Sequence, residues 1–430
     1  MPFKLIFMQK ILAIIPLILL PFFSIAGFDD DFINQTLRID YIHSGFEKEE
    51  YFALDQLIKE PAWDRSTTQL IDEFNYGKYR CEALDSASGR LLFRFNYANL
   101  FNEWQTTEDA KVNYKAFHES VIMPFPKKTI KVIFYSRDKK NVWKTAWNFF
   151  VNPSSYNILP ERKLVYPAKC IQNNGDPAKS LDITFLAEGY TYDEMSKFRK
   201  DAKRFADFLN ECSPYKEFRD KINFWTVESP SEESGTDLPG LGKWKKTILN
   251  ASFFTFGTER YLTTFDNKTM RDLAANTPYD FIIIIVNTEK YGGGGFYNTY
   301  ALCAADNSLS NYVLVHEFGH CLGGLGDEYY TSEVAVQDFY PAGVEPWEAN
   351  LTTLTDFDHK WKSMMDPGTP VPTPATDEYK GKVGVFEGGG YIEKGVYRPA
   401  LECTMKNLKY NGFCPVCKKA LFEVMEMYVK

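Results

Sequence analysis

The chain has 430 residues, a formal net charge of -8 and a pI near 5.4, and a chain of this length predicts two domains rather than one ordinary core. Hydrophobic residues make up 44% and aromatic residues 16% of the sequence, which excludes a globally disordered chain. The acidic balance and the lack of clustered cations exclude a nucleic-acid partner, because phosphate binding needs Lys and Arg side chains.

The first predicted element is a secretory signal at residues 1–26. Two lysines precede the apolar run ILAIIPLILLPFF, and the run is followed by Ser-Ile-Ala, which fits a small-x-small cleavage site. A membrane anchor is the alternative, but the run contains two prolines and is shorter than the roughly 20 residues of a spanning helix. The sequence therefore predicts an exported chain, secreted or periplasmic, without a membrane anchor after signal cleavage.

Residues 27–155 are predicted to form an all-β sandwich domain. Segments such as RLLFRFNYANLF, TIKVIFYSR and VWKTAWNFFVN alternate apolar and polar residues with period two, and they are rich in aromatic and β-branched side chains. Such segments are typical of strands with one buried face. This domain has no catalytic or metal-ligand spacing, so we expect a packing or recognition module.

Strands and helices alternate in the second predicted domain, residues 156–430, after a linker that contains Pro and Ser. The segment 192–210 carries apolar residues at helical spacing. Strands are predicted at LDITFLA, NFWTVES and FIIIIV, and the last is apolar throughout, as expected for a strand covered on both faces. This alternation predicts an α/β (α+β) domain with a mixed central sheet.

Four consecutive glycines, residues 292–295, follow the FIIIIV segment. No GKS or GKT follows them, which argues against a phosphate loop. We expect a mobile or bulged connection that leads to an edge strand beside the active cleft.

Residues 313–330 read VLVHEFGHCLGGLGDEYY and contain two of the five histidines of the chain in an HExxH frame. Ser308 or Ser310 is expected to cap a helix that ends at Gly323 and Gly324, where glycine readily adopts the left-handed conformation. The frame therefore lies on one helix.

In such a helix His316 and His320 lie one turn apart on one face, so both imidazoles can bind the same ion. Glu317 is offset by about 100° around the axis and suits a general base beside the ion. A catalytic zinc usually has three protein ligands and an open position. Asp327 is the candidate for the third ligand, and Glu328 is its rival.

The motif VLVHEFGHCLGGLGDEY resembles the zinc motif of metzincin-like peptidases, and most closely that of the M64 family, also named IgA peptidase. Further blocks resemble M64 blocks in the same order: FLAEGYTYDEMSKF, FWTVESPSEESGTDLPG, YGGGGFYN and VGVFEGGGYIEKGVYRPALECTMKNLKYNGFCPVC. They span nearly the whole second domain. The first domain resembles the β-rich domain that often precedes the peptidase in this family.

The resemblance implies that His316, His320 and Asp327 bind Zn²⁺ and that Glu317 is the catalytic base. The usual metzincin pattern, HExxHxxGxxH, has a histidine as third ligand, whereas this chain has an aspartate one residue later. When Gly324 is aligned with the glycine of the pattern, the Gly-x-x-ligand spacing is preserved. This alignment favours Asp327 over the glutamate that follows it.

Metzincins also place a methionine in a turn below the metal. Met405 is our candidate for this packing role, and Met364 and Met365 are the alternatives. An oxyanion donor is also expected, and the candidates are Tyr329, Tyr330 and Tyr397.

The chain contains eight cysteines, and the sequence does not assign disulfides among them. Cys414 and Cys417 form a CxxC pair near the C-terminus. This pair could be a redox motif, half of a zinc site or a local disulfide. A structural role is favoured because no second CxxC is present.

Together these features predict a secreted zinc-dependent endopeptidase, acting as a monomer on protein or glycoprotein substrates, with immunoglobulin-like proteins among the candidates. The alternative is an exported protein- or glycan-binding protein with a structural or weakly active zinc site. Glu317 favours the peptidase, because a structural zinc needs no base. A zinc hydrolase of non-peptide substrates fits the motif as well.

Overall fold

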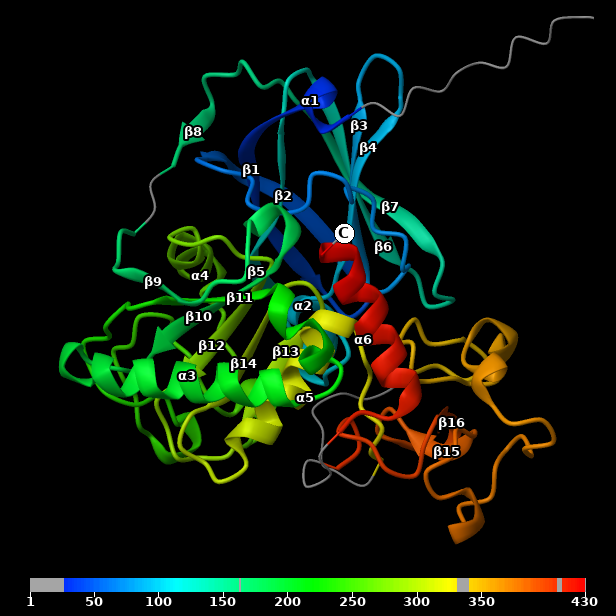
Figure 1. Cartoon of the computed structure of the whole chain (residues 1–430). Coiled ribbons are helices and arrows are strands. Elements are labelled where there is room, and N and C mark those ends of the chain that lie inside the picture. The colour runs from blue at the N-terminus through cyan, green and yellow to red at the C-terminus, as the bar shows by residue number, and fades with distance from the viewer. Residues whose placement is uncertain (1–26, 162–163, 331–339, 408–411, 430) are drawn as a thin grey trace, which may run out of the picture.

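The computed structural model describes residues 27–161, 164–330, 340–407 and 412–429. The predicted signal segment, residues 1–26, lies outside the described residues. Within them the chain forms a mixed α+β fold with four sheets and few helices (Figure 1). Among the described helices, none is both long enough and apolar enough to span a bilayer.

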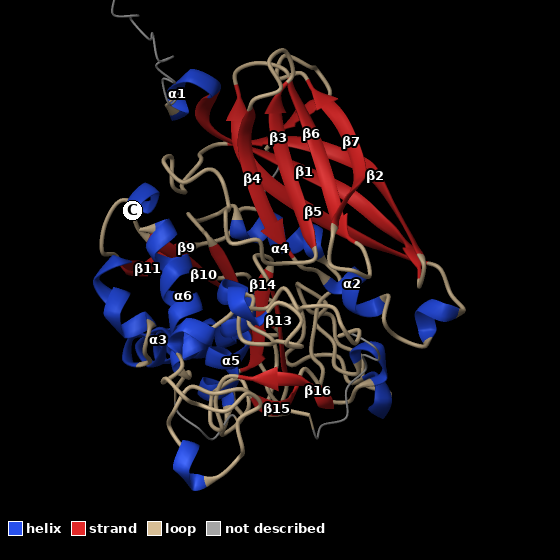
Figure 2. Ribbon diagram, turned by 90° about the vertical axis from the view of Figure 1, so that its right-hand side faces the viewer, coloured by secondary structure: helices blue, strands red, loops and turns tan. Residues whose placement is uncertain are grey.

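Two four-stranded sheets make up the N-terminal part, with strand orders β5-β1-β2-β8 and β4-β3-β6-β7 (Figure 2). The two sheets share one core, in which Leu37 and Tyr41 of one sheet pack with Cys81 and Phe134 of the other. The elements are α1 (Phe28–Asp31), β1 (Phe32–Phe46), β2 (Glu49–Glu60), β3 (Tyr79–Asp85), β4 (Leu91–Tyr97), α2 (Leu100–Trp104), η1 (Asp109–Lys111), β5 (Lys115–Pro126), β6 (Ile130–Arg137), β7 (Trp143–Val151) and β8 (Ile158–Pro160).

The prediction of a β-rich N-terminal domain is confirmed, but the prediction that it is all β is wrong. The helix α2 follows β4 directly, because the side chain of Asn99 accepts a hydrogen bond from the amide of Asn102 and caps the helix. Asn99 lies near the end of the segment RLLFRFNYANLF, whose period-two pattern predicts a strand only, and Asn102 directly follows that segment. The predicted linker also contributes a strand, because β8 pairs in parallel with β2.

A six-stranded mixed sheet forms the centre of the second part, with strand order β13-β14-β12-β10-β11-β9. The four inner strands are parallel, and the two edge strands, β9 and β13, are antiparallel to their neighbours. The predicted mixed central sheet is present. The strands are β9 (Ala168–Gln172), β10 (Leu181–Glu188), β11 (Ile222–Val227), β12 (Phe281–Val286), β13 (Gly293–Phe296) and β14 (Tyr300–Ala304).

All six residues of β12 are buried, because both faces of the sheet are covered. Ile283 and Ile285 pack with α3 (Met195–Glu211), α5 (Ser310–Gly323) and α6 (Pro415–Tyr428). Ile282 and Ile284 belong instead to the core that includes α4 (Asn267–Ala274) and the N-terminal sheets. The apolar run FIIIIV therefore marks the layer between two cores.

The C-terminal part contains a two-stranded sheet of β15 (Phe386–Gly389) and β16 (Ile392–Arg398) (Figure 1). The remaining elements are 3-10 helices: η2 (Pro177–Lys179), η3 (Tyr192–Glu194), η4 (Tyr215–Lys221), η5 (Pro239–Leu241), η6 (Thr255–Gly257), η7 (Phe357–His359), η8 (Lys362–Met364) and η9 (Asp377–Tyr379).

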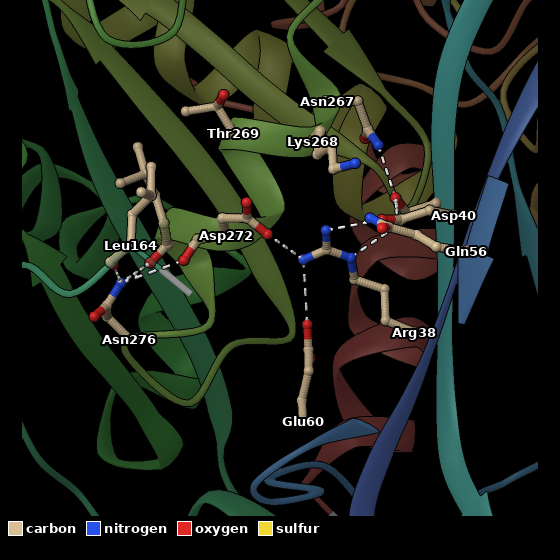
Figure 3. A network of polar contacts seen from close by, with 12 residues as sticks. Arg38, Asp40, Gln56, Glu60, Leu164, Asn267, Lys268, Thr269, Asp272 and Asn276 are labelled. Carbon is tan, nitrogen blue, oxygen red and sulfur yellow. Dashed lines mark hydrogen bonds and ion pairs between the residues drawn. The ribbon is translucent and has the colours of Figure 1, made fainter. Parts of the chain in front are cut away.

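The N-terminal sheets are attached to the second part through a buried arginine (Figure 3). Arg38 of β1 donates two hydrogen bonds to Asp40, at 2.8 and 2.9 Å, and one to Asp272 of α4 at 2.7 Å. Burial raises the pKa of the Asp40 carboxyl, but the hydrogen bond and the charge of Arg38 lower it below its usual value overall. The arginine thus joins α4 to the N-terminal sheet by a charge pair shielded from water.

We expect the substitution Arg38→Met to lower the free energy of unfolding by about 3–5 kcal/mol, because it leaves buried carboxylates without their cation. Chemical denaturation of the full chain measures this loss. The matched control is Arg90→Met, since Arg90 pairs with Asp31 at 2.7 Å while its side chain stays 48% exposed. An exposed pair contributes about 0–1 kcal/mol, so equal losses in both variants would contradict the role given to Arg38.

Candidate metal centre

The helix α5 carries the HExxH frame and ends where the glycines predict. Gly324 is the C-terminal cap with a φ of 56°, in the left-handed region, and its amide bonds back to the carbonyls of Gly319 and His320. The predicted serine cap is wrong. Ser310 is the first residue of the helix and Leu309 precedes it without a side-chain cap; Asn307 Oδ1 instead accepts a hydrogen bond from the Leu309 amide at 3.1 Å.

Three side-chain atoms converge at the end of α5. His316 Nε2 lies 3.2 Å from His320 Nε2, and Asp327 Oδ1 lies 3.0 Å from the first and 3.4 Å from the second. Four ligands at about 2.0–2.2 Å around a tetrahedral zinc are separated by about 3.3–3.6 Å. The spacing of the three atoms is therefore close to that of ligands around one ion.

The hydrogen bonds of the two imidazoles fit a cation in this position. His316 Nδ1 donates to the carbonyl of Thr404 at 3.0 Å, and His320 Nδ1 donates to the carbonyl of Leu325. Since a carbonyl only accepts, the Nε2 atom of each neutral ring is left with its lone pair toward Asp327. Asp327 Oδ1 is itself buried without a hydrogen-bond partner among the described residues. The lone pairs of His316 Nε2, His320 Nε2 and Asp327 Oδ1 are thus directed toward one another.

The pKa values of His320 and Asp327 depend on each other. Burial lowers the pKa of His320, but the Asp327 carboxylate raises it, to about 9 overall. Burial raises the pKa of Asp327, but the two histidines hold it well below its usual range. Without a cation, a proton on the imidazole balances the carboxylate, and a bound metal ion would replace that proton.

Glu317 lies beside the three converging atoms and against the edge strand β13. A Cβ added at Gly293 would lie 2.9 Å from the Glu317 carboxylate, and one at Gly295 would lie 2.2 Å from the Glu317 carbonyl oxygen. The predicted edge strand is present, but glycines 293–295 form it themselves instead of a connection that leads to it, and β13 pairs with β14 without a bulge. These glycines allow β13 to approach α5 closely. Burial raises the pKa of Glu317, and the two nearby histidines lower it in part.

The two candidate third ligands point to different places. Asp327 faces the histidines, and its Oδ2 accepts a hydrogen bond from the hydroxyl of Tyr391. Glu328 is fully buried and contacts Asn350 Nδ2 at 3.0 Å and Cys417 Sγ at 3.1 Å. The structure therefore brings only Asp327 to the histidine pair.

The candidate methionine lies beneath the helix that carries the histidines. Met405 is fully buried, and its sulfur would lie 3.0 Å from a Cβ added at Gly319 of α5. Met364 and Met365 are partly buried at the margin of the same core. The packing of Met405 against α5 agrees with the position expected for it.

The converging residues lie in a cleft with a cavity volume of about 150 Å³. Of the candidate oxyanion donors, Tyr329 lines this cleft, whereas Tyr330 packs against Arg398 at 5.5 Å and Tyr397 lies on β16. The ring of Tyr329 stacks near that of His316 at 6.4 Å.

Several residues of the cleft were not identified from the sequence. Asn102 and Glu103 come from α2 of the N-terminal part, Arg260 comes from a loop, and Tyr391 comes from the turn between β15 and β16. The hydroxyl of Tyr261 donates a hydrogen bond to Glu103, and burial raises the pKa of Glu103 to about 7. No local spacing connects these residues to the HExxH frame, and the one local signal for the start of α2 is Asn99, a residue type common at helix N-caps.

Comparison with known families gives two matches. The family model described as IgA Peptidase M64 matches residues 170–380 and 375–425, and the model described as Peptidase M64 N-terminus matches residues 27–148. The first alone covers more than half of the chain. No curated protein matches the sequence.

We expect Gly295→Ala to destabilise the chain by about 1–3 kcal/mol, because the added methyl group overlaps the carbonyl oxygen of Glu317 and must push β13 away from α5. Chemical denaturation measures the change. The control is Gly27→Ala, where the nearest heavy atom to the new Cβ is 3.9 Å away. If both variants unfold at the same denaturant concentration as the unsubstituted chain, the close approach does not matter for stability.

Proposed function

The chain belongs to the M64 peptidase family and is a metallopeptidase, and we propose that it is a zinc-dependent endopeptidase of metzincin-like architecture. The observation that carries this proposal is the convergence of His316, His320 and Asp327 beside Glu317 in one cleft. Two imidazoles and one carboxylate form a donor set that suits zinc and leaves a coordination position for substrate.

In the proposed mechanism, the bound cation supplies a Lewis acid that polarises the scissile carbonyl and makes water more acidic. Glu317 takes a proton from the attacking water and delivers it to the leaving amine. Its burial favours this role, because a carboxylate with a raised pKa holds the proton long enough to transfer it. The hydrogen bond from Tyr391 to Asp327 and the bonds of the imidazoles to backbone carbonyls keep the ligands in place.

Tyr329 is our candidate for the donor that stabilises the developing oxyanion. It lines the cleft and lies near His316, and the Arg260 guanidinium lies 5.7 Å from the centre of its ring. A cation over an aromatic face is held by the ring quadrupole. Arg260 therefore positions the tyrosine and adds positive charge at this wall of the cleft.

The substrates that we propose are proteins or glycoproteins, immunoglobulin-like proteins among them, and the enzyme is proposed to act as a monomer. We further propose export by a signal at residues 1–26, a sandwich domain at 27–155 and a peptidase domain at 156–430. What supports a division into two domains is that the chain passes from the first pair of sheets to the mixed sheet between β8 (Ile158–Pro160) and β9 (Ala168–Gln172), a few residues after the proposed boundary.

Glu317→Gln is expected to retain the metal and to lower the rate of peptide hydrolysis by about 10²–10⁴-fold, because the amide fills the same space without accepting a proton. Cleavage of a mixed peptide library, followed by mass spectrometry with and without a chelator, measures the rate and identifies the cleaved bonds. Full hydrolysis by the variant would exclude Glu317 as the base. A wild-type chain that binds proteins but cleaves no peptide would favour the binding-protein alternative.

Asp327→Ala is expected to remove one metal ion per chain, because two imidazoles alone hold zinc weakly. Elemental analysis of the dialysed chain gives the number of ions. Asp306→Ala is the matched control, since Asp306 pairs with Lys197 on the surface at 2.8 Å. A metal content unchanged in Asp327→Ala would show that the third ligand is another residue.

A further inference from the structure

Three cysteines and a glutamate form a second buried cluster, distinct from the histidine centre. It consists of Glu328, Cys403, Cys414 and Cys417, and one ligand atom of each lies within 4.8 Å of the others. All four residues are buried, with exposed fractions of 0–3%. The cysteines are unpaired with one another in disulfides. The cluster thus places four potential metal-binding atoms in one solvent-excluded space.

The distances in the cluster are close to those of a tetrahedral metal site. Cys403 Sγ and Cys417 Sγ are 3.7 Å apart, and Cys417 Sγ lies 3.1 Å from Glu328 Oε1. Two sulfurs bound to one zinc ion at about 2.3 Å are separated by about 3.8 Å. A thiol and a carboxylate oxygen on the same ion come somewhat closer. Small movements would therefore bring the four atoms around one ion.

The backbone around the cysteines favours thiolates. Cys414 caps α6, and its sulfur accepts from the amide of Cys417 at 3.5 Å, while the Cys414 amide points to Cys403 Sγ at 3.3 Å. These two amides and the positive end of the α6 helix dipole place positive charge beside the sulfurs, which favours the thiolate form.

Glu328 supplies the second observation that points to a ligand. Its carboxyl group is fully buried, Oε1 bonds to Asn350, and Oε2 has no hydrogen-bond partner among the described residues. A buried carboxyl oxygen without a partner is costly. A disulfide between two of the cysteines would leave the third thiol and this oxygen unsatisfied. A divalent cation would satisfy all four groups at once.

We propose that these four side chains form a structural zinc site, with three thiolates from Cys403, Cys414 and Cys417 and a carboxylate from Glu328. Zinc fits this donor set because it binds thiolates tetrahedrally and does not change oxidation state. Binding displaces the protons of the thiols and of the carboxyl group. All four positions are closed by protein, so this site performs no hydrolysis.

The site would hold the backbone on which the histidine centre depends. Glu328 directly follows Asp327, and its amide donates to the carbonyl of Met405 at 2.9 Å. The carbonyl of Thr404, between Cys403 and Met405, accepts from His316. An ion bound by Cys403 and Glu328 therefore fixes two segments, one orienting His316 and the other carrying Asp327.

Metal analysis and cobalt substitution test this site on the full chain. We expect two zinc ions per chain in the wild type and one in the double variant Cys414→Ser/Cys417→Ser. The variant His316→Ala/His320→Ala should also hold one ion. In the cobalt-substituted chain, a sulfur-to-cobalt charge-transfer band should be present in the wild type and in the histidine variant, and lost in the cysteine variant. Cys170→Ser, which changes an exposed cysteine, should retain both ions and the band.

Two measurements on the wild type keep the test valid if the cysteine variant does not fold. Cobalt without a charge-transfer band would overturn the proposal, and so would a disulfide among the three cysteines found by peptide mapping under denaturing alkylation. Alkylation of the native chain should modify these three cysteines only after a chelator is added. If the histidine centre bound no metal, His316→Ala/His320→Ala would leave the metal content unchanged while the sulfur band persists. This outcome is therefore distinguishable from failure of the cysteine site.

Discussion

A short backbone contact between the turn after α5 and the segment around Met405 determines the geometry of the histidine centre. The amide of Glu328 donates to the carbonyl of Met405 at 2.9 Å, and the preceding carbonyl, that of Thr404, accepts from His316 at 3.0 Å. The helix by itself sets the spacing of the two imidazoles but not the rotation of their rings. This contact sets the ring of His316 and the position of Asp327 together, so residues about 80 positions apart in the chain have to be assembled before three ligand atoms can meet.

The N-terminal sheets contribute to the cleft as well as to the core. The amide of Ala98 donates to the carbonyl of Tyr297 at 3.0 Å, and Thr299 Oγ1 donates to the carbonyl of Ala98 at 2.7 Å. These bonds tie the chain just before α2 to the turn that joins β13 and β14, where Tyr297 lines the cleft. The salt bridge of Arg38 with α4 holds the same two parts together on another side. The N-terminal sheets are therefore part of the scaffold that positions β13 against Glu317.

The local part of this arrangement could be predicted from the sequence, and the long-range part could not. Helical spacing of the histidines, the glycines that end α5 and the apolar β12 all depend on neighbours within a few residues, and those predictions hold. The strand β8, the cleft residue Glu103 and the partner Tyr391 of Asp327 depend on contacts between distant segments. Such contacts produce no periodic pattern of apolar residues in the sequence. The alignment of Gly324 with the glycine of the metzincin pattern favours Asp327 over Glu328, and Gly324 has the left-handed conformation that ends α5 before Asp327.

The neighbours Asp327 and Glu328 are better understood as partners than as rivals for one ion. They lie in an irregular segment without helical bonds, where consecutive side chains can point to opposite sides. One carboxylate faces the imidazoles and the other faces the thiols. The backbone just before them is fixed by Asn350, which bonds to both the amide and the carbonyl of Gly326. A single peptide unit links the two carboxylates, so a displacement of either cluster is transmitted to the other. A closed metal site at the cysteine cluster can therefore keep the histidine centre rigid.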